Sequence, residues 1–147
     1  GKPGASLRMW KDFYPQANIY GGDIDKEILF KDERIETFYV DQRNSEQIKS
    51  MWSKINKKFD IIIDDSTHIF DHQINIIKKV HPFIKRNGIL IIEDIYKKRK
   101  ENLEENYYKK IKNLNYIFEK IYFVEFHNIN NYTANWKNEK LLILIKK

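Results

Sequence analysis

Short apolar runs that end in acidic residues dominate the hydrophobic pattern of this chain. The clearest run is the three consecutive isoleucines Ile61–Ile63, which Phe59 and Asp60 precede and which lead into the polar segment DDSTH at residues 64–68. A second run, Gly88–Ile92, leads in the same way into Glu93 and Asp94. Unbroken β-branched runs of this length are typical of strands buried on both faces in parallel α/β sheets. Ligands bind beyond the carboxyl ends of such strands, so we expect both acidic groups at one edge of a sheet.

The rest of the pattern alternates between strand and helix. Further strands are expected over 18–25 and 34–40, and helices over about 6–14, 45–55 and 70–84. A polar helical segment over 97–113 precedes apolar runs at 117–126 and 140–145, which predict a C-terminal antiparallel hairpin joined by the loop 127–139. Ser6 is expected to cap the first helix, and Asn87 or Gly88 to end the helix over 70–84.

This alternation predicts an α/β fold in a single domain over residues 1–147. The sheet is expected to be mostly parallel, with right-handed crossovers and helices on both faces. A chain of 147 residues is long enough to bury a core of its own.

Composition and charge narrow the class of protein. The absence of cysteine excludes disulfides and thiolate metal sites and suits a reducing, cytoplasmic setting. No signal peptide is expected, and no apolar run approaches the roughly 20 residues of a membrane span. The net charge of +6 reflects lysine clusters such as 97–100 and 109–112. We interpret these clusters as solvated helix faces and expect no nucleic-acid partner, because no binding signature accompanies them.

The acids at the two strand ends suggest a metal site. Asp65, Glu93 and Asp94 offer carboxylate oxygens, which are the ligands that Mg²⁺ prefers. A metal bound there would lower the pKa of a hydroxyl group, and His68 can accept a proton near neutral pH. The alternative is that Asp64 and Asp65 cap the following helix and that His68 is a residue of its first turn. His72 is equally compatible with ligand contact and with packing.

The N-terminal segment carries features of a nucleotide-type cofactor site. Residues 1–6 form a glycine-containing loop that opens a helix, where a ligand can approach backbone N–H groups. Asp23 lies near the end of the strand expected over 18–25. In nucleotide-type folds, an acid at the end of the second strand accepts hydrogen bonds from ribose hydroxyls. The alternative for the glycine-containing loop is a plain turn. The alternative for Asp23 is an acidic turn that caps the next helix, and Asp25 is expected to be a helix cap. Asp41 lies just past the strand over 34–40 and is expected at the same edge.

Together these motifs resemble class I S-adenosylmethionine-dependent methyltransferases. More narrowly, they resemble the metal-dependent sugar O-methyltransferases of the macrocin and mycinamicin type. The matching segments, in family order across nearly the whole chain, are 4–10, 20–25, 41–42, 64–68 with 72–73, and 92–94. The resemblance implies a Rossmann-like fold, S-adenosylmethionine and Mg²⁺ as cofactors, and methyl transfer to a hydroxyl of a sugar or glycosylated natural product.

The resemblance also implies a role for each site residue. The cofactor would be bound by residues along its length: Gly1, Gly4 and Ser6 at the methionine end, Asp23 at the ribose, Asp41 at the adenine, and Asp64 near the transferred methyl group. Mg²⁺ would be coordinated by Asp65, Glu93 and Asp94. His68 would be the general base.

Two departures from the family pattern matter. Ser66 replaces the glycine of the family's Asp-Asp-Gly-Ser-His, so Ser66 must adopt any unusual backbone angle of that glycine, or the loop must differ. The first, central strand of the family sheet would precede Gly1, so we expect an N-terminally truncated domain. A non-catalytic methyltransferase-like domain and, with less support, an RNA-directed methyltransferase are the alternatives. The acceptor and a homo-oligomeric state are left open.

Overall fold

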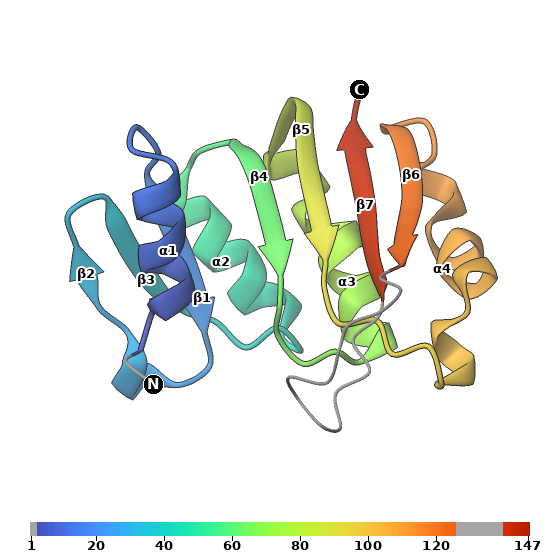
Figure 1. The fold of residues 1–147 in the computed structure, drawn as a ribbon, viewed down its shortest axis with the longest axis horizontal. Coiled ribbons are helices and arrows are strands. Elements are labelled where there is room, and N and C mark those ends of the chain that lie inside the picture. The colour runs from blue at the N-terminus through green and yellow to red at the C-terminus, as the bar shows by residue number, and fades with distance from the viewer. Residues whose placement is uncertain (1–2, 126–139) are drawn as a thin grey trace. The chain divides into compact units, whose positions relative to one another are not determined.

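The computed structural model describes residues 3–125 and 140–147, and the chain divides into two compact units (Figure 1). Unit 1 is Gly1–Ile55 and unit 2 is Asn56–Lys147. Each unit has its own sheet, with three strands in unit 1 and four in unit 2 among the described residues. The predicted α/β class is confirmed. Within the described residues, no helix is both long enough and apolar enough to cross a membrane.

Unit 1 contains two α-helices and a small mixed sheet. Its elements are α1 (Ala5–Phe13), β1 (Ile19–Asp23), the 3₁₀ helix η1 (Lys26–Ile28), β2 (Lys31–Asp32), β3 (Ile35–Tyr39) and α2 (Ser45–Ile55). The strand order is β1-β3-β2, with β1 and β3 parallel and β2 antiparallel to β3. The apolar face predicted for α2 is buried at Ile48, Trp52 and Ile55.

The two helices of unit 1 lie on opposite faces of its sheet. Successive residues of a strand point to opposite faces. A Cβ atom on Gly21 would lie 2.7 Å from a methyl carbon of Leu7 in α1, whereas one on Gly22 would lie 3.2 Å from the sulfur of Met51 in α2. Both helices therefore pack directly on β1, and the predicted arrangement with helices on both faces is found in this unit.

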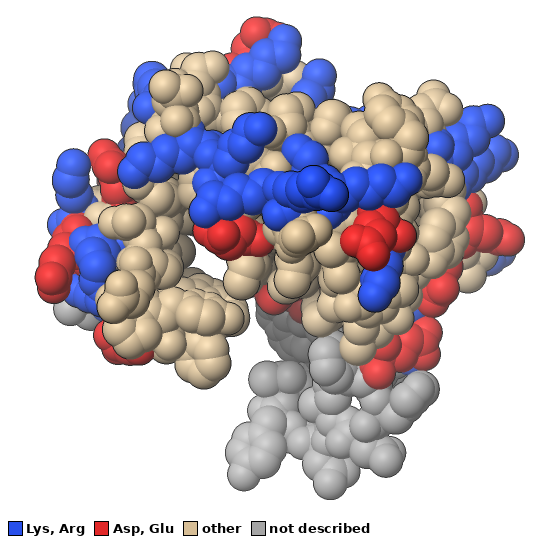
Figure 2. Space-filling model, turned by 90° about the horizontal axis from the view of Figure 1, so that it is seen from above, with Lys and Arg blue, Asp and Glu red and all other residues tan. Residues whose placement is uncertain are grey.

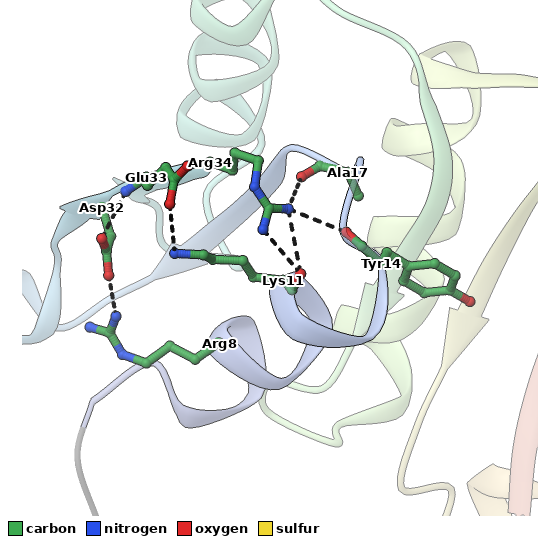
Figure 3. A network of polar contacts seen from close by, with 7 residues as sticks. All are labelled: Arg8, Lys11, Tyr14, Ala17, Asp32, Glu33 and Arg34. Atoms are coloured by element: carbon green, nitrogen blue, oxygen red, sulfur yellow. Dashed lines mark hydrogen bonds and ion pairs between the residues drawn. The ribbon is translucent and has the colours of Figure 1, made fainter.

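A polar network joins α1 to the β2–β3 turn (Figure 3). The Arg34 guanidinium donates hydrogen bonds to the backbone oxygens of Ala17 at 2.9 Å, of Tyr14 at 3.3 Å and of Lys11 at 3.3 and 3.4 Å. Arg8 in α1 pairs with Asp32 in β2. Arg34 thus binds one carbonyl in the last turn of α1, that of Lys11, and two in the segment that follows the helix.

Unit 2 contains the strands that carry the acidic ends. Its elements are β4 (Phe59–Asp64), α3 (Phe70–Val80), η2 (His81–Phe83), β5 (Ile84–Ile92), η3 (Lys100–Asn102), α4 (Glu104–Ile111), η4 (Lys112–Leu114), β6 (Phe118–Glu125) and β7 (Lys140–Lys146). The strand order is β4-β5-β7-β6. β4 and β5 are parallel, and β7 pairs antiparallel with both β5 and β6. The predicted C-terminal antiparallel pair is confirmed, and its loop at 127–139 lies outside the described residues.

The two sheets contain more antiparallel strand pairs than a mostly parallel sheet, which the sequence predicted, would have. The parallel pairs β1–β3 and β4–β5 follow the prediction, but β2, β6 and β7 make both sheets mixed. The single-domain organisation over residues 1–147 stays a prediction.

The core of unit 2 lies between one face of its sheet and the helices α3 and α4. Leu90, Ile92, Leu142 and Leu144 are fully buried on this face. Ile77 of α3 and Tyr107 of α4 are also fully buried. The Tyr107 ring makes edge contacts with Phe70 at 4.8 Å and Phe123 at 5.5 Å between ring centroids. The segment 97–113, which looks polar in the sequence, therefore supplies core side chains.

Three predicted boundaries were wrong. α3 ends at Val80 because Pro82 has no backbone N–H and begins a 3₁₀ turn, so the helix does not reach Ile84. Asn87 is left-handed, with φ of 61°, but it lies at an irregularity inside β5 rather than at a helix end. The residue before α1 is Gly4, with φ of 76°, and no side chain caps that helix, so Ser6 is not its cap.

Candidate functional site

The carboxyl ends of β4 and β5 lie side by side at one edge of the sheet of unit 2. Asp64 and Ile92 are paired in the parallel register, so Asp65 and Glu93 leave their strands at the same level. The Glu93 backbone N–H donates to the Asp64 carbonyl at 2.9 Å and extends this pairing. The edge predicted from the two isoleucine-rich runs is therefore present.

Three side chains meet at this edge. One ligand atom from each of Asp65, His68 and Asp94 lies within 4.8 Å of the other two. His68 Nε2 is 3.6 Å from Asp94 Oδ2. His68 and Asp94 both have left-handed backbone angles, with φ of 54° and 55°. Two oxygen donors and one nitrogen donor are thus held together by unusual backbone at the ends of β4 and β5. The prediction that both strands are buried on both faces is wrong for β4, in which Asp60 and Ile61 are exposed.

The electrostatics of this edge favour a cation. Burial raises the pKa of Asp65, and the nearby Asp94 carboxylate raises it further. Burial also raises the pKa of Glu93, and Asp65 adds to that shift. Within residues 3–125 and 140–147, no Lys or Arg forms an ion pair with these three acids.

The donor set suits a divalent ion. Carboxylate oxygens are ligands of Mg²⁺ and Mn²⁺, and an imidazole nitrogen is compatible with Mn²⁺. Among the residues that the structure describes, none is a hydrogen-bond partner of the buried His68 Nδ1. Glu93 lies close enough to Asp65 to shift its own pKa, but it is not part of the three-residue group defined above.

The loop between β4 and α3 does not act as a helix cap. α3 begins at Phe70, its preceding residue is Ile69, and no side chain caps its first turn. Asp64 is 8% exposed and accepts a hydrogen bond from Ser66 Oγ at 2.6 Å. The capping alternative for Asp64 and Asp65 is therefore wrong, and His68 precedes the helix.

The serine that replaces the family glycine fits without strain. Ser66 is absent from the residues with positive φ, and the left-handed position of this loop is at His68. At the next residue of the loop, Thr67 Oγ1 and His72 Nδ1 are 2.9 Å apart. His72 thus contacts the loop itself, one helical turn beyond His68.

Two residues beside His68 were missed in the sequence. The His68 and Tyr96 rings meet edge to face with centroids 6.0 Å apart. Arg99 lies over the Tyr96 ring at 4.7 Å and donates to the His68 carbonyl at 3.4 Å. The sequence signal for both residues was their position just after Glu93 and Asp94. The basic run at 97–100 suggested a solvated surface instead.

The cofactor candidates of unit 1 lie at the carboxyl edge of its parallel strand pair (Figure 1). Gly4 and Ser6 are at the start of α1. Asp23 is the last residue of β1, and its Oδ1 accepts from the Asp25 backbone N–H at 2.8 Å. Asp25 in turn caps η1 through the Glu27 N–H, as expected. Gly1 lies outside the described residues.

Asp41 follows β3 but already has a partner. Both of its carboxylate oxygens accept hydrogen bonds from the Arg43 side chain, at 2.7 to 3.1 Å. Its backbone N–H donates to Gln47 Oε1 at 2.9 Å. Asp41 is thus held rigidly at the strand end, and a ligand approaching it also meets the Arg43 guanidinium.

Basic side chains gather at the other edge of the sheet of unit 2. Figure 2 shows Lys and Arg on the face viewed from above Figure 1, which in this unit includes the edge where β4 and β5 begin and β7 ends. Lys146 at the end of β7 donates to the carbonyls of His81 at 3.0 Å and Ile84 at 2.8 Å. Burial, followed by repulsion from Lys58, lowers the pKa of Lys146. The net positive charge of the chain therefore says little about the acidic edge.

Known sugar O-methyltransferases match the chain in sequence. The mycinamicin VI 2''-O-methyltransferase of Micromonospora griseorubida is 37% identical over 93 residues, covering 63% of this chain and 23% of that enzyme. The demethylmacrocin O-methyltransferase of Streptomyces fradiae is 34% identical over 93 residues, with the same coverage. The chain resembles the sugar O-methyltransferases. It spans about a quarter of the length of these relatives, and no family model matches it.

Solved structures confirm the methyltransferase fold. A methyltransferase from the mycinamycin biosynthetic pathway, in complex with Mg, SAH and mycinamycin VI, matches with a TM-score of 0.71 and 23% identity. That match covers 97% of this chain and 40% of the solved one. The Methanococcus jannaschii fibrillarin pre-rRNA processing protein matches with a TM-score of 0.67 and 18% identity, covering 99% and 64% of the two chains.

Proposed function

We propose that the chain is the catalytic part of an S-adenosylmethionine- and Mg²⁺-dependent O-methyltransferase. Its acceptor is proposed to be a hydroxyl of a sugar or of a glycosylated natural product. The observation that carries the proposal is the cluster of Asp65, His68 and Asp94 at the carboxyl edge of two parallel strands. The named activities of the sequence relatives, all sugar or glycoside O-methyltransferases, support the acceptor class.

Asp65, Glu93 and Asp94 are proposed to hold the Mg²⁺ ion. The pKa values of Asp65 and Glu93 are raised by burial and by neighbouring carboxylates, so bringing these acids together costs free energy that a cation would offset. When bound, Mg²⁺ would supply positive charge that polarises the acceptor hydroxyl. The solved mycinamycin-pathway relative contains Mg and SAH, which supports the same pair of cofactors here.

His68 is proposed to be the general base. Its Nε2 faces Asp94. The Tyr96 ring contacts the His68 ring, and Arg99 donates a hydrogen bond to the His68 carbonyl. In the proposed reaction the acceptor hydroxyl gives its proton to His68 while its oxygen forms a bond to the sulfonium methyl carbon. The carbon–sulfur bond breaks, and its electron pair stays on sulfur as S-adenosylhomocysteine. Holding the two reactants in line supplies much of the rate enhancement.

Each residue proposed to bind the cofactor is assigned to one part of it. Gly1, Gly4 and Ser6 are proposed for its methionine end, Asp23 for the ribose, Asp41 for the adenine and Asp64 for the methyl end. Gly4 precedes α1 with a left-handed backbone, and the N–H groups that open α1 are suited to anionic ligand atoms. Residues 1–147 are proposed to act as one domain in the cytoplasm, and a cysteine-free chain is compatible with that setting.

Transfer of a labelled methyl group from S-adenosylmethionine tests the proposal. The acceptor in the assay is a macrolide with a free sugar 2-hydroxyl, with and without Mg²⁺. We expect labelled product that EDTA abolishes, and a loss of at least about 100-fold in His68→Ala, the scale of a removed general base. Asp60→Asn is the matched control, because this exposed acid lies at the far end of β4 and pairs with Lys85.

A negative assay is informative when calorimetry accompanies it. If neither S-adenosylhomocysteine nor Mg²⁺ binds the chain, the proposed enzyme is wrong and the non-catalytic alternative stands. Turnover that is equal in wild type and His68→Ala would remove the base assignment while leaving the methyltransferase intact.

A further inference from the structure

A buried glutamine and a buried tyrosine lie directly behind the metal candidates. Gln73 of α3 is 1% exposed and Tyr107 of α4 is fully buried. The Tyr107 hydroxyl donates a hydrogen bond to Gln73 Oε1 at 2.5 Å. Gln73 Nε2 donates to the Glu93 backbone carbonyl at 3.1 Å. The two helices thus reach the end of β5 through a continuous chain of hydrogen bonds.

The partners fix the direction of this chain. The Glu93 carbonyl can only accept, so the Gln73 amide nitrogen must face it and the amide oxygen must face Tyr107. Burial raises the pKa of Tyr107, and the Asp64 carboxylate adds to the shift, so the hydroxyl keeps its proton and donates. Reversing the amide would take the Gln73 donor away from the part-buried Glu93 carbonyl and place the amide oxygen against it, which costs free energy. The glutamine side chain therefore has one stable orientation.

The carbonyl that Gln73 holds belongs to the peptide between Glu93 and Asp94. The orientation of this peptide plane sets the φ angle of Asp94, which is left-handed at 55°. Its neighbours are also held, because the Glu93 N–H bonds to Asp64 and the Ile95 N–H bonds to the Lys140 carbonyl at 3.1 Å. Without the Gln73 bond, the 93–94 peptide could rotate and release Asp94 into the common right-handed or extended regions. The Asp94 side chain would then leave the cluster with Asp65 and His68.

We propose that Gln73 and Tyr107 are positioning residues for the metal site: their hydrogen-bond chain fixes the Glu93–Asp94 peptide and so directs the Asp94 carboxylate at Asp65 and His68. This inference rests on the proposed binding of a divalent cation by Asp65, Glu93 and Asp94. Neither side chain touches the ion or the reactants. Their effect is transmitted through one peptide plane, as in metal sites whose ligands depend on hydrogen-bonded partners.

The test measures binding of Mn²⁺ to the full chain by electron paramagnetic resonance, without turnover. Gln73→Met keeps the length of the side chain and removes both hydrogen bonds, and we expect its Mn²⁺ affinity to fall by about 10- to 100-fold. Tyr107→Phe removes only the hydroxyl and should weaken Mn²⁺ binding in the same direction by a smaller factor. Tyr108→Phe is the matched control, since this neighbouring tyrosine is exposed and its hydroxyl donates to the Ile121 carbonyl at 3.4 Å.

The double variant Gln73→Met with Tyr107→Phe distinguishes a role in positioning the metal ligands from a role in fold stability alone. Gln73→Met alone leaves the buried Tyr107 hydroxyl without its acceptor, and Tyr107→Phe removes that hydroxyl, so the unfolding midpoint of the double variant should recover relative to Gln73→Met. Affinity that stays weak in a stably folded double variant supports positioning, whereas affinity that recovers with the midpoint overturns it. Wild-type affinity in both single variants would also overturn it while leaving the metal site in place. Absence of Mn²⁺ binding in the wild-type chain would instead overturn the proposed metal function itself.

Discussion

His68 and Asp94 face each other across the ends of β4 and β5, with Nε2 3.6 Å from Oδ2, and both have left-handed backbone angles. Residues other than glycine adopt this conformation at a cost of about 1–2 kcal/mol each. Strained positions of this kind persist where the surrounding structure holds them, and they cluster at functional sites. The pairing of two such residues with Asp65 is the strongest structural sign that this edge is a binding site.

Replacing Asp65 by asparagine should stabilise the metal-free protein at neutral pH. The folded-state pKa of Asp65 is raised by burial and by Asp94, so its contribution to stability is present below the unfolded pKa of about 3.9 and is lost as pH rises through the folded pKa. In EDTA, the thermal midpoint of Asp65→Asn should exceed that of wild type at pH 7. The difference should shrink as pH falls through the raised folded-state pKa of Asp65 and should vanish below about 4.

Excess Mg²⁺ should reverse that order, because binding stabilises only the protein that retains the ligand. Asp60→Asn serves as the control, since this acid is exposed and pairs with Lys85. An Asp65→Asn midpoint at or below the wild-type value in EDTA at pH 7 would contradict the assignment of repulsion at this edge.

Gly4→Ala should destabilise unit 1. The φ of 76° costs a residue with a Cβ about 1–2 kcal/mol, and the added Cβ would lie 2.2 Å from the Phe30 ring. Urea unfolding measures the loss. In a Phe30→Leu background the clash is relieved and only the backbone cost should remain, so equal losses in both backgrounds would rule out the contact with Phe30.

Arg34→Lys should cost about 1–2 kcal/mol of unfolding free energy although the charge is kept. A lysine cannot reproduce the fork that binds the carbonyls of Ala17, Tyr14 and Lys11 (Figure 3). Chemical denaturation compares it with Arg43→Lys, in which an exposed guanidinium loses its pairing with Asp41 and stability should change by less than about 1 kcal/mol. Similar losses in the two variants would show that the carbonyl contacts are not stabilising.

Local sequence signals were enough to predict β4, β5 and the helices that follow the strands. Three isoleucines followed by Asp64 indicate both the strand and its polar end. The spacing of Ile74, Ile77 and Val80 indicates the buried face of α3. These features depend on residues a few positions apart. Periodicity therefore captures them.

Features that depend on distant residues could not be predicted in this way. β2 is two exposed residues, Lys31 and Asp32, and exists only because β3 pairs with it. Tyr107 lies in a polar stretch, and its contact with Gln73 joins residues 34 positions apart. The left-handed angles at His68 and Asp94 arise from tertiary contacts, because neither residue type favours that conformation strongly enough to mark it.

Binding of Mn²⁺ by the full chain, followed by electron paramagnetic resonance at neutral pH, tests the central claim most directly. We predict one site that Mg²⁺ displaces, and an affinity reduced by at least about 10-fold in Asp65→Asn and in Asp94→Asn. Asp60→Asn should bind as wild type does. Absence of a bound Mn²⁺ signal, or equal affinity in wild type and both cluster variants, would contradict the account.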